Sequence, residues 1–436
     1  MTPKQIISEA ESNSSFRGLR DDGAVTLSQP ASSKILTIYR VLKNRFLRFV
    51  RTYRRLLIPL LIVLSAKIVS SIFLYNFMNM GSVDTYWMAV DWDTEGQNAV
   101  IKSVVNQGMR WPYVFLGWDS AWYLAIVTKG YAFSDLSYAF FPGFPLLTWL
   151  LNLITQNAAL TLAVFSFILG LAWVPVYQLV AENYQDKFKA SQSTLFFAFF
   201  PYVFLFTSVV YAEGLFLFST LAAWYFFEKK KMLLAMVFAS LATISRAPGF
   251  IIVLPILIKM IQSYRRDESR LPRRDFLYLL APFACLSVWY LNLSFHGWFP
   301  PSNITGWEGL YSFRVLVLDV LPQKGVQGLL AYFQAFPFSP AFIVFLVATP
   351  FLIFASAKTD KALAVYSVAY FVGVLLFGGL ASIPRFVSFI FPIWFPLTSK
   401  LFQVKHSKVI TAVIVVVFWL AAVFLWFSFL NGEFVA

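Results

Sequence analysis

The sequence predicts an all-α protein that crosses a membrane many times. Of its 436 residues, 59% are hydrophobic and only 13% are charged, whereas about a quarter of the residues in a soluble protein carry charge. Several apolar runs reach the roughly 20 residues that a helix needs to cross the hydrocarbon core of a bilayer. The alternating pattern of a membrane β-barrel is missing. These observations together predict a polytopic helical membrane protein.

The N-terminal region differs from the rest of the chain in polarity and charge. Residues 1–33 are polar and rich in serine, which predicts a disordered cytoplasmic tail. The next segment, 34–56, carries eight basic residues and no acidic residue among its apolar ones. It fits either a basic amphipathic helix on the anionic cytoplasmic leaflet or the positive flank of the first span. Both interpretations place the N-terminus in the cytoplasm.

About eleven spans are expected within residues 57–430, with a short tail at 431–436. Their approximate bounds are 57–79, 158–180, 192–210, 212–227, 232–245, 248–262, 276–294, 331–356, 362–381, 386–402 and 409–430. In this arrangement every loop rich in lysine or arginine falls on the cytoplasmic side, as the positive-inside rule requires. The net charge of +14 therefore reflects loop bias, and nucleic acid is not expected as a partner.

Two long loops, 81–157 and 295–330, then fall on the extracytoplasmic side. Within the first, residues 138–154 are apolar but short and contain two prolines, which favours an interfacial or re-entrant helix. Ionisable groups beside hydrocarbon are costly and usually face a cavity or a partner. Three such residues at span ends share the side of these loops: Glu213, Arg246 and Arg385. Their convergence predicts a site there.

The stretch GWDSAWY in the first outer loop contains the residue best suited to chemistry. Asp119 lies among Trp118, Trp122 and Tyr123. Aromatic residues around an acid can form an interfacial belt. They can equally form a platform for a sugar or a prenyl chain beside a carboxylate that acts as a general base. The motif alone leaves both interpretations open.

Arg246 and Arg385 each occur beside a proline at a span end. A single arginine that snorkels to the interface would be ordinary there. Two arginines facing one cavity suit a phosphate, because the guanidinium fork binds its oxygens bidentately. We therefore expect the pair to bind a phosphate. Glu213 either complements the N-terminus of its helix or belongs to the same site.

Other polar residues carry weaker signals. Asp91 and Asp93 in VDWDTEG could bind a metal or the hydroxyls of an acceptor, but a solvated loop is the simpler interpretation. The single cysteine, Cys285, excludes an intramolecular disulfide. Two histidines provide no His/Cys metal cluster, so no metal or cofactor is expected. Lys67, inside the first span, is expected to pair or snorkel without a chemical role.

Four stretches resemble one family. WDSAWYLAIVTKGY…YAFFPGFPLL resembles the motif of the PIG-V family, the second mannosyltransferase of GPI-anchor synthesis and its prokaryotic relatives. SVVYAEGLFLF is similar to that family's Tyr-Ser-Glu-Ser stretch, with Ala212 and Gly214 in place of the serines. LATISRAPGF resembles its Thr-Arg-x-x-Gly segment with one residue inserted, and IPRFVSFIFP its Pro-Arg-Tyr…Phe-Pro segment. The acid that often follows the family's Gly-Tyr pair is represented here only by Asp135.

The resemblance implies a GT-C-type fold and an inverting membrane glycosyltransferase. Such an enzyme takes mannose from a polyprenyl-phosphate donor and passes it to a glycan or glycolipid acceptor on the extracytoplasmic face. The resemblance implies that an acid in the first outer loop is the general base, which fits Asp119, and a lipid-phosphate donor fits the phosphate site expected from Arg246 and Arg385. The residues expected to contact substrates are Trp118, Trp122, Tyr123, Glu213, Asp91 and Asp93. The implied location is a bacterial inner membrane with a periplasmic site, or the endoplasmic reticulum membrane in a eukaryote.

Two other functions fit the same spans. A transporter or flippase of a lipid-linked sugar would share the polar cavity, but should show repeated halves with interrupted helices near the membrane midplane. The polar residues here gather at one face instead, which favours an enzyme. Another GT-C enzyme with a different sugar or acceptor would have the same architecture. A structural scaffold has no need of an acid and two arginines on one face.

Overall fold

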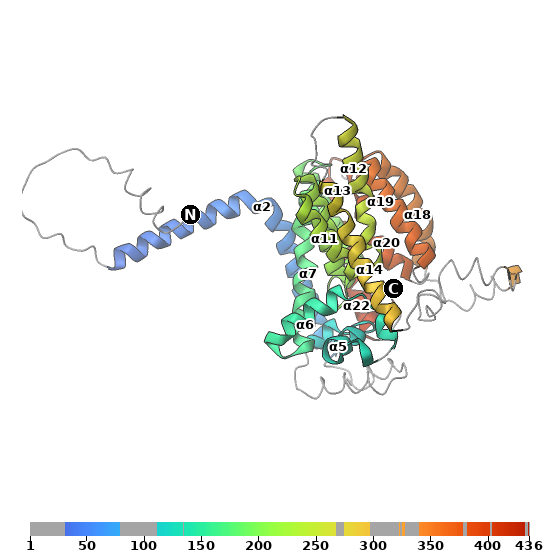
Figure 1. The fold of residues 1–436 in the computed structure, drawn as a ribbon. Coiled ribbons are helices and arrows are strands. Elements are labelled where there is room, and N and C mark those ends of the chain that lie inside the picture. Colours follow the sequence, from blue (N-terminus) through green and yellow to red (C-terminus); the bar gives the residue numbers. More distant parts are fainter. Residues whose placement is uncertain are drawn as a thin grey trace, which may run out of the picture. The chain divides into compact units, whose positions relative to one another are not determined.

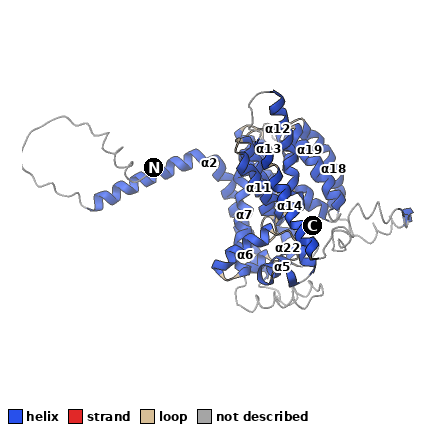
Figure 2. Cartoon of the chain, viewed as in Figure 1, coloured by secondary structure: helices blue, strands red, loops and turns tan. Residues whose placement is uncertain are grey.

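The computed structural model describes most of the apolar part of the chain. The described residues are 31–78, 111–133, 135–266, 274–296, 322, 325–327, 340–377, 382–401, 403–431 and 435. Within them every regular element is a helix, as Figure 2 shows. The chain divides into two units, Met1–Tyr53 and Arg54–Ala436, and the site lies in the second. The predicted tail lies outside the described residues except for its last three positions.

The first helix, α2, runs without a break from Ala31 to Met78. The predicted juxtamembrane segment 34–56 and the predicted first span 57–79 lie on this one continuous helix, and their division into two functional parts stays a prediction. Pro59 lies inside the helix and does not end it. The part of α2 that is long and apolar enough to cross a membrane is Tyr53–Phe77.

Five helices of the described chain have the length and composition of membrane spans. Besides the span in α2 they are α7 (Ala158–Ala181), η4 with α12 (Ala247–Ile252 and Val253–Arg266), α13 with α14 (Arg274–Tyr278 and Leu280–Phe295) and α22 (Ser407–Leu430). Shorter apolar helices include α11 (Met232–Ser245), α18 (Pro340–Ala357) and α19 (Lys361–Phe377). The prediction of a helical membrane protein is confirmed, while the count of eleven spans stays a prediction.

Two predicted spans are interrupted. The segment 192–210 forms α8 (Lys187–Phe199) and the short α9 (Pro201–Phe206). The segment 386–402 forms α20 (Ile383–Ser388), η7 (Phe391–Ile393) and α21 (Trp394–Leu401). Proline lies in the first turn of α9, α20 and η7, where its missing N–H is tolerated and where it starts a new helix. The short helices α9 and α20 that result pack against each other.

Helix α10 (Glu213–Glu228) forms the centre of the second unit. Its sequence is apolar on all sides, which suits a helix buried by its neighbours. It packs closely against α7 and α11. Because α10 and α11 are joined by a short turn and run antiparallel, the start of α10 meets the end of α11.

The predicted interfacial segment is the helix α6 (Gly143–Thr155), which packs against α7 and α5 (Ser120–Lys129). Its outward face exposes Leu146, Trp149, Leu153 and Ile154, an apolar surface suited to lipid. Three short 3₁₀ helices flank α5, namely η1 (Trp111–Phe115), η2 (Tyr131–Phe133) and η3 (Asp135–Ala139). Figure 1 shows α5 and α6 together at one end of the second unit and α12 at the other.

Candidate active site

Four ionisable residues from distant parts of the sequence meet in one cluster: Asp119, Glu213, Arg246 and Arg385. The Nε of Arg385 donates to Glu213 Oε1 at 2.5 Å, and its Nη2 contacts the same oxygen. Arg246 Nη1 lies 2.5 Å from that oxygen as well. Arg385 Nη1 forms an ion pair with Asp119 Oδ2 at 3.5 Å. The predicted convergence is therefore found, and we call these four residues the acid–arginine cluster.

Local sequence explains why these side chains meet. Glu213 is the first residue of α10, and Arg246 follows the last residue of the antiparallel α11. Arg246 has an extended backbone and is followed by the 3₁₀ helix η4, which contains Pro248 in its first turn. Arg385 follows Pro384 in α20. Helix ends set by proline thus bring both arginines to the N-terminus of α10.

The four side chains differ strongly in exposure. Glu213 is 1% exposed, Arg385 8%, Arg246 17% and Asp119 39%. A buried carboxylate is costly unless opposite charge and hydrogen bonds compensate it, and two arginines do so for Glu213. Asp119 is the member of the cluster that a substrate reaches most easily.

The carboxylate of Asp119 is not occupied in capping a helix. Asp119 occupies the N-cap position of α5, but it has helical backbone angles and its side chain makes no cap hydrogen bond. Its backbone N–H instead donates to the hydroxyl of Tyr211 at 3.2 Å. Partial burial raises the pKa of the Asp119 carboxyl, and the positive charge of Arg385 acts in the opposite direction. A carboxyl with a raised pKa is a stronger base once it is ionised.

The backbone around Asp119 is fixed by the segment that precedes α10. Val210 N–H donates to the carbonyl of Phe115 at 2.8 Å. The hydroxyl of Ser120 donates to the carbonyl of Val210 at 3.0 Å. Together with Tyr211, these contacts hold the residues on both sides of Asp119 against one short connection.

Helix α22 holds the same loop from another side. Trp426 Nε1 donates to the carbonyl of Val114 at 2.8 Å. Gly117 lies so close to Phe429 that a Cβ on the glycine would be 2.6 Å from a ring carbon. Trp118 has a φ of +48°, which is uncommon for a residue with a side chain. Strained backbone of this kind is often found at functional sites.

Aromatic rings cover the two arginines. The guanidinium of Arg385 lies 4.5 Å from the ring centre of Phe206 and 4.6 Å from that of Tyr211. Arg246 lies 4.9 Å from the ring centre of Phe386. Cation–π contacts stabilise desolvated guanidinium groups and restrict where they point. Sequence reasoning missed all three rings, although Tyr211 lies only two residues before Glu213.

The predicted aromatic contacts lie in two environments. Tyr123 is buried and packs edge-on against Phe140 and Phe144, which favours a role in packing. Trp122 is partly exposed and stacks on Phe140 at 5.6 Å between ring centres. Trp118 is partly exposed as well. These two tryptophans stay candidates for substrate contact.

Asp91 and Asp93 lie outside the described residues. Among the residues that the structure does describe, no group of three or more histidine, cysteine, aspartate or glutamate side chains is placed to hold a metal ion.

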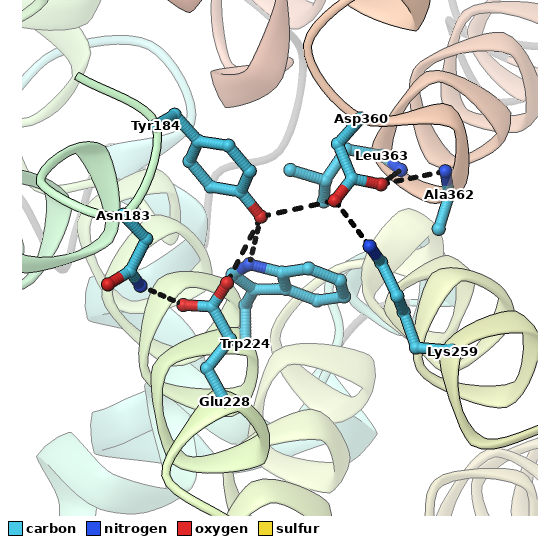
Figure 3. A network of polar contacts seen from close by, with 8 residues as sticks. All are labelled: Asn183, Tyr184, Trp224, Glu228, Lys259, Asp360, Ala362 and Leu363. Carbon is cyan, nitrogen blue, oxygen red and sulfur yellow. Dashed lines mark hydrogen bonds and ion pairs between the residues drawn. The ribbon is translucent and has the colours of Figure 1, made fainter. Parts of the chain in front are cut away.

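A second polar network occupies the opposite end of α10 (Figure 3). Tyr184 donates its hydroxyl hydrogen to Glu228 Oε1 at 3.0 Å, and Asn183 contacts Glu228 Oε2. Lys259 lies 2.7 Å from Asp360 Oδ2. We call this group the Tyr184 network. It joins the turn after α7 to α10, α12 and the start of α19.

Comparison with known proteins gives a family and a set of distant structures. The family model described as mannosyltransferase (PIG-V) matches residues 54–298, more than half of the chain. Among solved structures, the apo oligosaccharyltransferase of Archaeoglobus fulgidus is 14% identical, with a TM-score of 0.42 over 85% of this chain and 55% of that one. The same organism's enzyme with an inhibitory peptide and a dolichol-phosphate is 16% identical, with a TM-score of 0.44 over 88% and 56%. This chain thus spans about half the length of those structures. No curated protein matches it significantly.

Proposed function

The chain belongs to the mannosyltransferase (PIG-V) family, and from that membership we propose that it moves mannose from a polyprenyl-phosphate donor to a glycan or glycolipid acceptor. The observation that carries the proposal is the partly exposed carboxylate of Asp119, which makes no helix-cap bond and lies beside two arginines that share Glu213. This arrangement supplies a base on one side of a reacting sugar and positive charge for a leaving phosphate on the other.

The proposed reaction is a single displacement at the anomeric carbon. A hydroxyl oxygen of the acceptor forms the new glycosidic bond while the bond between that carbon and the phosphate oxygen breaks. Asp119 takes the hydroxyl proton as the bond forms. The polyprenyl phosphate leaves with the bonding electron pair, and arginine stabilises the charge that develops on it. The configuration at the anomeric carbon is inverted.

The contacts suggest different roles for the two arginines. All three side-chain nitrogens of Arg385 contact carboxylates, so this residue suits the positioning of Asp119. Arg246 contacts Glu213 through Nη1 and is the more exposed of the two. We therefore assign the donor phosphate chiefly to Arg246. Glu213 acts as the shared anchor that holds both guanidinium groups.

The proposed reaction needs no metal, because an arginine stabilises the negative charge that develops on the leaving phosphate. Transfer should therefore continue in the presence of EDTA.

We place the site on the extracytoplasmic face and the N-terminus in the cytoplasm, from the distribution of basic loops. Cysteines introduced at Ser263 and Ser302 should then label from opposite sides of sealed vesicles, and labelling from one side would contradict this orientation.

The test of the proposed function is a transfer assay with the purified protein in proteoliposomes. The donor is polyprenyl-phosphate mannose labelled in the sugar, with labelled polyprenyl-phosphate glucose as the matched control. Mannose should leave the lipid for an added membrane extract of acceptors, and glucose should remain lipid-linked. Movement of intact labelled lipid between leaflets without loss of mannose would instead support a flippase.

A further inference from the structure

Lys67 occupies an unusual position for a charged residue. It lies in the membrane-length part of α2, and its side chain is fully buried. Its Nζ donates to the carbonyl of Thr207 at 2.7 Å and to the Thr207 hydroxyl at 3.0 Å. The ring centre of Phe204 lies 5.4 Å away. Lys67 was expected to pair or to snorkel. It pairs with Thr207 rather than with a carboxylate of the described residues, and because its side chain is enclosed it does not snorkel.

The acceptor of this contact is the backbone at the end of α9. Carbonyls at a helix end lack partners within the helix and must find donors elsewhere. For Thr207, Lys67 supplies that donor within the described part of the chain. Gly170 of helix α7 lies directly against this contact. A Cβ on this glycine would lie 1.7 Å from the Thr207 carbonyl oxygen and 3.1 Å from Lys67 Nζ.

The segment that begins at Thr207 leads directly into the acid–arginine cluster. Residues 207–212 connect α9 to α10. Val210 holds the backbone on both sides of Asp119. Tyr211 accepts the Asp119 backbone N–H and stacks on Arg385. The position of this connection therefore sets the position of the proposed base.

We propose that Lys67 is a positioning residue that anchors the 207–212 connection and thereby orients Asp119 for mannosyl transfer. The proposal rests on the proposed function. Lys67 acts through the Thr207 carbonyl and does not touch the substrate. A buried cation in a membrane helix is costly. Anchoring the 207–212 connection is the function that we propose for it.

The first test is the Lys67→Met variant, which keeps an unbranched side chain but removes the donors. Small displacements of reacting groups reduce rates steeply, so kcat for mannosyl transfer should fall about 10-fold to 100-fold. The KM for the donor should stay within about twofold, because Arg246 pairs with Glu213, and the packing of α10 against α7 and α11 holds that glutamate in place. The matched control is Ser70→Ala, since Ser70 is buried in the same helix and contacts Trp419 of α22. Its kcat should be unchanged.

A double variant separates positioning from general damage. If Lys67 acts through Asp119, then Lys67→Met should cause no further loss of turnover in an Asp119→Asn background. A further loss as large as that in the wild-type background would overturn the proposal. Should Lys67→Met not insert, Thr207→Val removes one of the two contacts. It should reduce kcat in the same direction by a smaller factor, and unchanged turnover in it would overturn the proposal as well.

Amide hydrogen exchange tests the anchor without any enzymatic readout. Exchange at residues 207–212 should rise in Lys67→Met relative to Ser70→Ala. Unchanged exchange would overturn the role of Lys67 even if the wild-type protein transfers mannose. Raised exchange in a protein whose wild-type form transfers no mannose would overturn the proposed function, and the positioning role with it.

Discussion

The two ends of α10 each hold a cluster of ionisable side chains, and the clusters use their carboxylates differently. In the Tyr184 network every carboxylate oxygen of Glu228 and Asp360 has a partner. In the acid–arginine cluster, Glu213 Oε1 contacts both arginines, while the buried Oε2 has no hydrogen-bond partner among the residues that the structure describes. Asp119 has a long contact to Arg385 and a partly exposed carboxylate. A cluster in which every carboxylate oxygen has a partner suits a structural role. A carboxylate that can still accept hydrogen bonds, such as that of Asp119, suits contact with a substrate.

Asp360 illustrates the saturated case (Figure 3). Its Oδ1 accepts from the N–H groups of Ala362 and Leu363 at 2.9 and 3.3 Å, which caps the start of α19. Its Oδ2 forms an ion pair with Lys259. Asp119 also precedes a helix, yet it makes no cap bond. Two aspartates at similar helix positions therefore differ in what their side chains do, and this difference can be tested by the same substitution at both.

The largest effect is expected at Asp119. Asp119→Asn retains shape and hydrogen bonding but removes the basic oxygen, so turnover should fall by about 10²–10⁴-fold. Asp360→Asn is the matched control and should transfer mannose at a rate near that of the wild type. Initial rates at saturating donor measure both. Near-normal turnover of a properly inserted Asp119→Asn protein would remove the base assignment.

A smaller loss is expected at Arg246. Arg246→Ala removes a charge-assisted contact worth about 1.5–3 kcal/mol, which corresponds to a loss of about 10-fold to 100-fold in kcat/KM. Arg246→Lys should be impaired too, because a point charge does not reproduce the guanidinium fork. The kinetics should be measured against donor concentration. Unchanged donor KM and turnover in both variants would exclude Arg246 from the phosphate site.

The two glutamates of α10 form the next matched pair. Glu213→Gln removes the charge that both arginines share, so we expect turnover to fall about tenfold as the guanidinium groups lose their common anchor. Glu228→Gln keeps hydrogen-bonding groups for Asn183 and Tyr184, so its turnover should change less than about twofold. Equal losses in the two variants would mean that both ends of α10 serve only to hold the fold.

The smallest kinetic effect is expected for loss of the α19 cap. Asp360→Ala removes an N-cap, which should lower the free energy of unfolding by about 1 kcal/mol, and it leaves Lys259 without its carboxylate. Thermal unfolding in detergent should therefore start at a lower temperature, while kcat per folded molecule stays unchanged. A loss of kcat beyond the loss of folded protein would place the Tyr184 network in the reaction.

The sequence was enough to predict which residues converge, but not how they pair. Glu213, Arg246 and Arg385 lie at predicted span ends and Asp119 lies in the first outer loop, so the distribution of basic loops predicts one face for all four without any tertiary information. That both arginines bind Glu213 depends on side-chain contacts between α10, α11 and α20. Such contacts leave no periodic pattern in a sequence.

The interrupted helices were missed for a related physical reason. The residues beside Pro201 and Pro392 are apolar, so a hydropathy window averages across each break and reports one span. The role of Lys67 was missed because the sequence shows a lysine in an apolar run but does not show which group accepts its hydrogen bond. That acceptor is a backbone carbonyl 140 residues further along the chain, and only the fold brings the two together.

We propose that mannose leaves a polyprenyl phosphate in a single displacement at the acid–arginine cluster. The configuration of the product tests this most directly. A donor of known anomeric configuration is incubated with the wild-type protein, and the new glycosidic linkage is assigned by nuclear magnetic resonance. We expect a linkage of the opposite configuration. Retention would require a covalent intermediate and a second displacement, and would contradict the role of Asp119 as a general base.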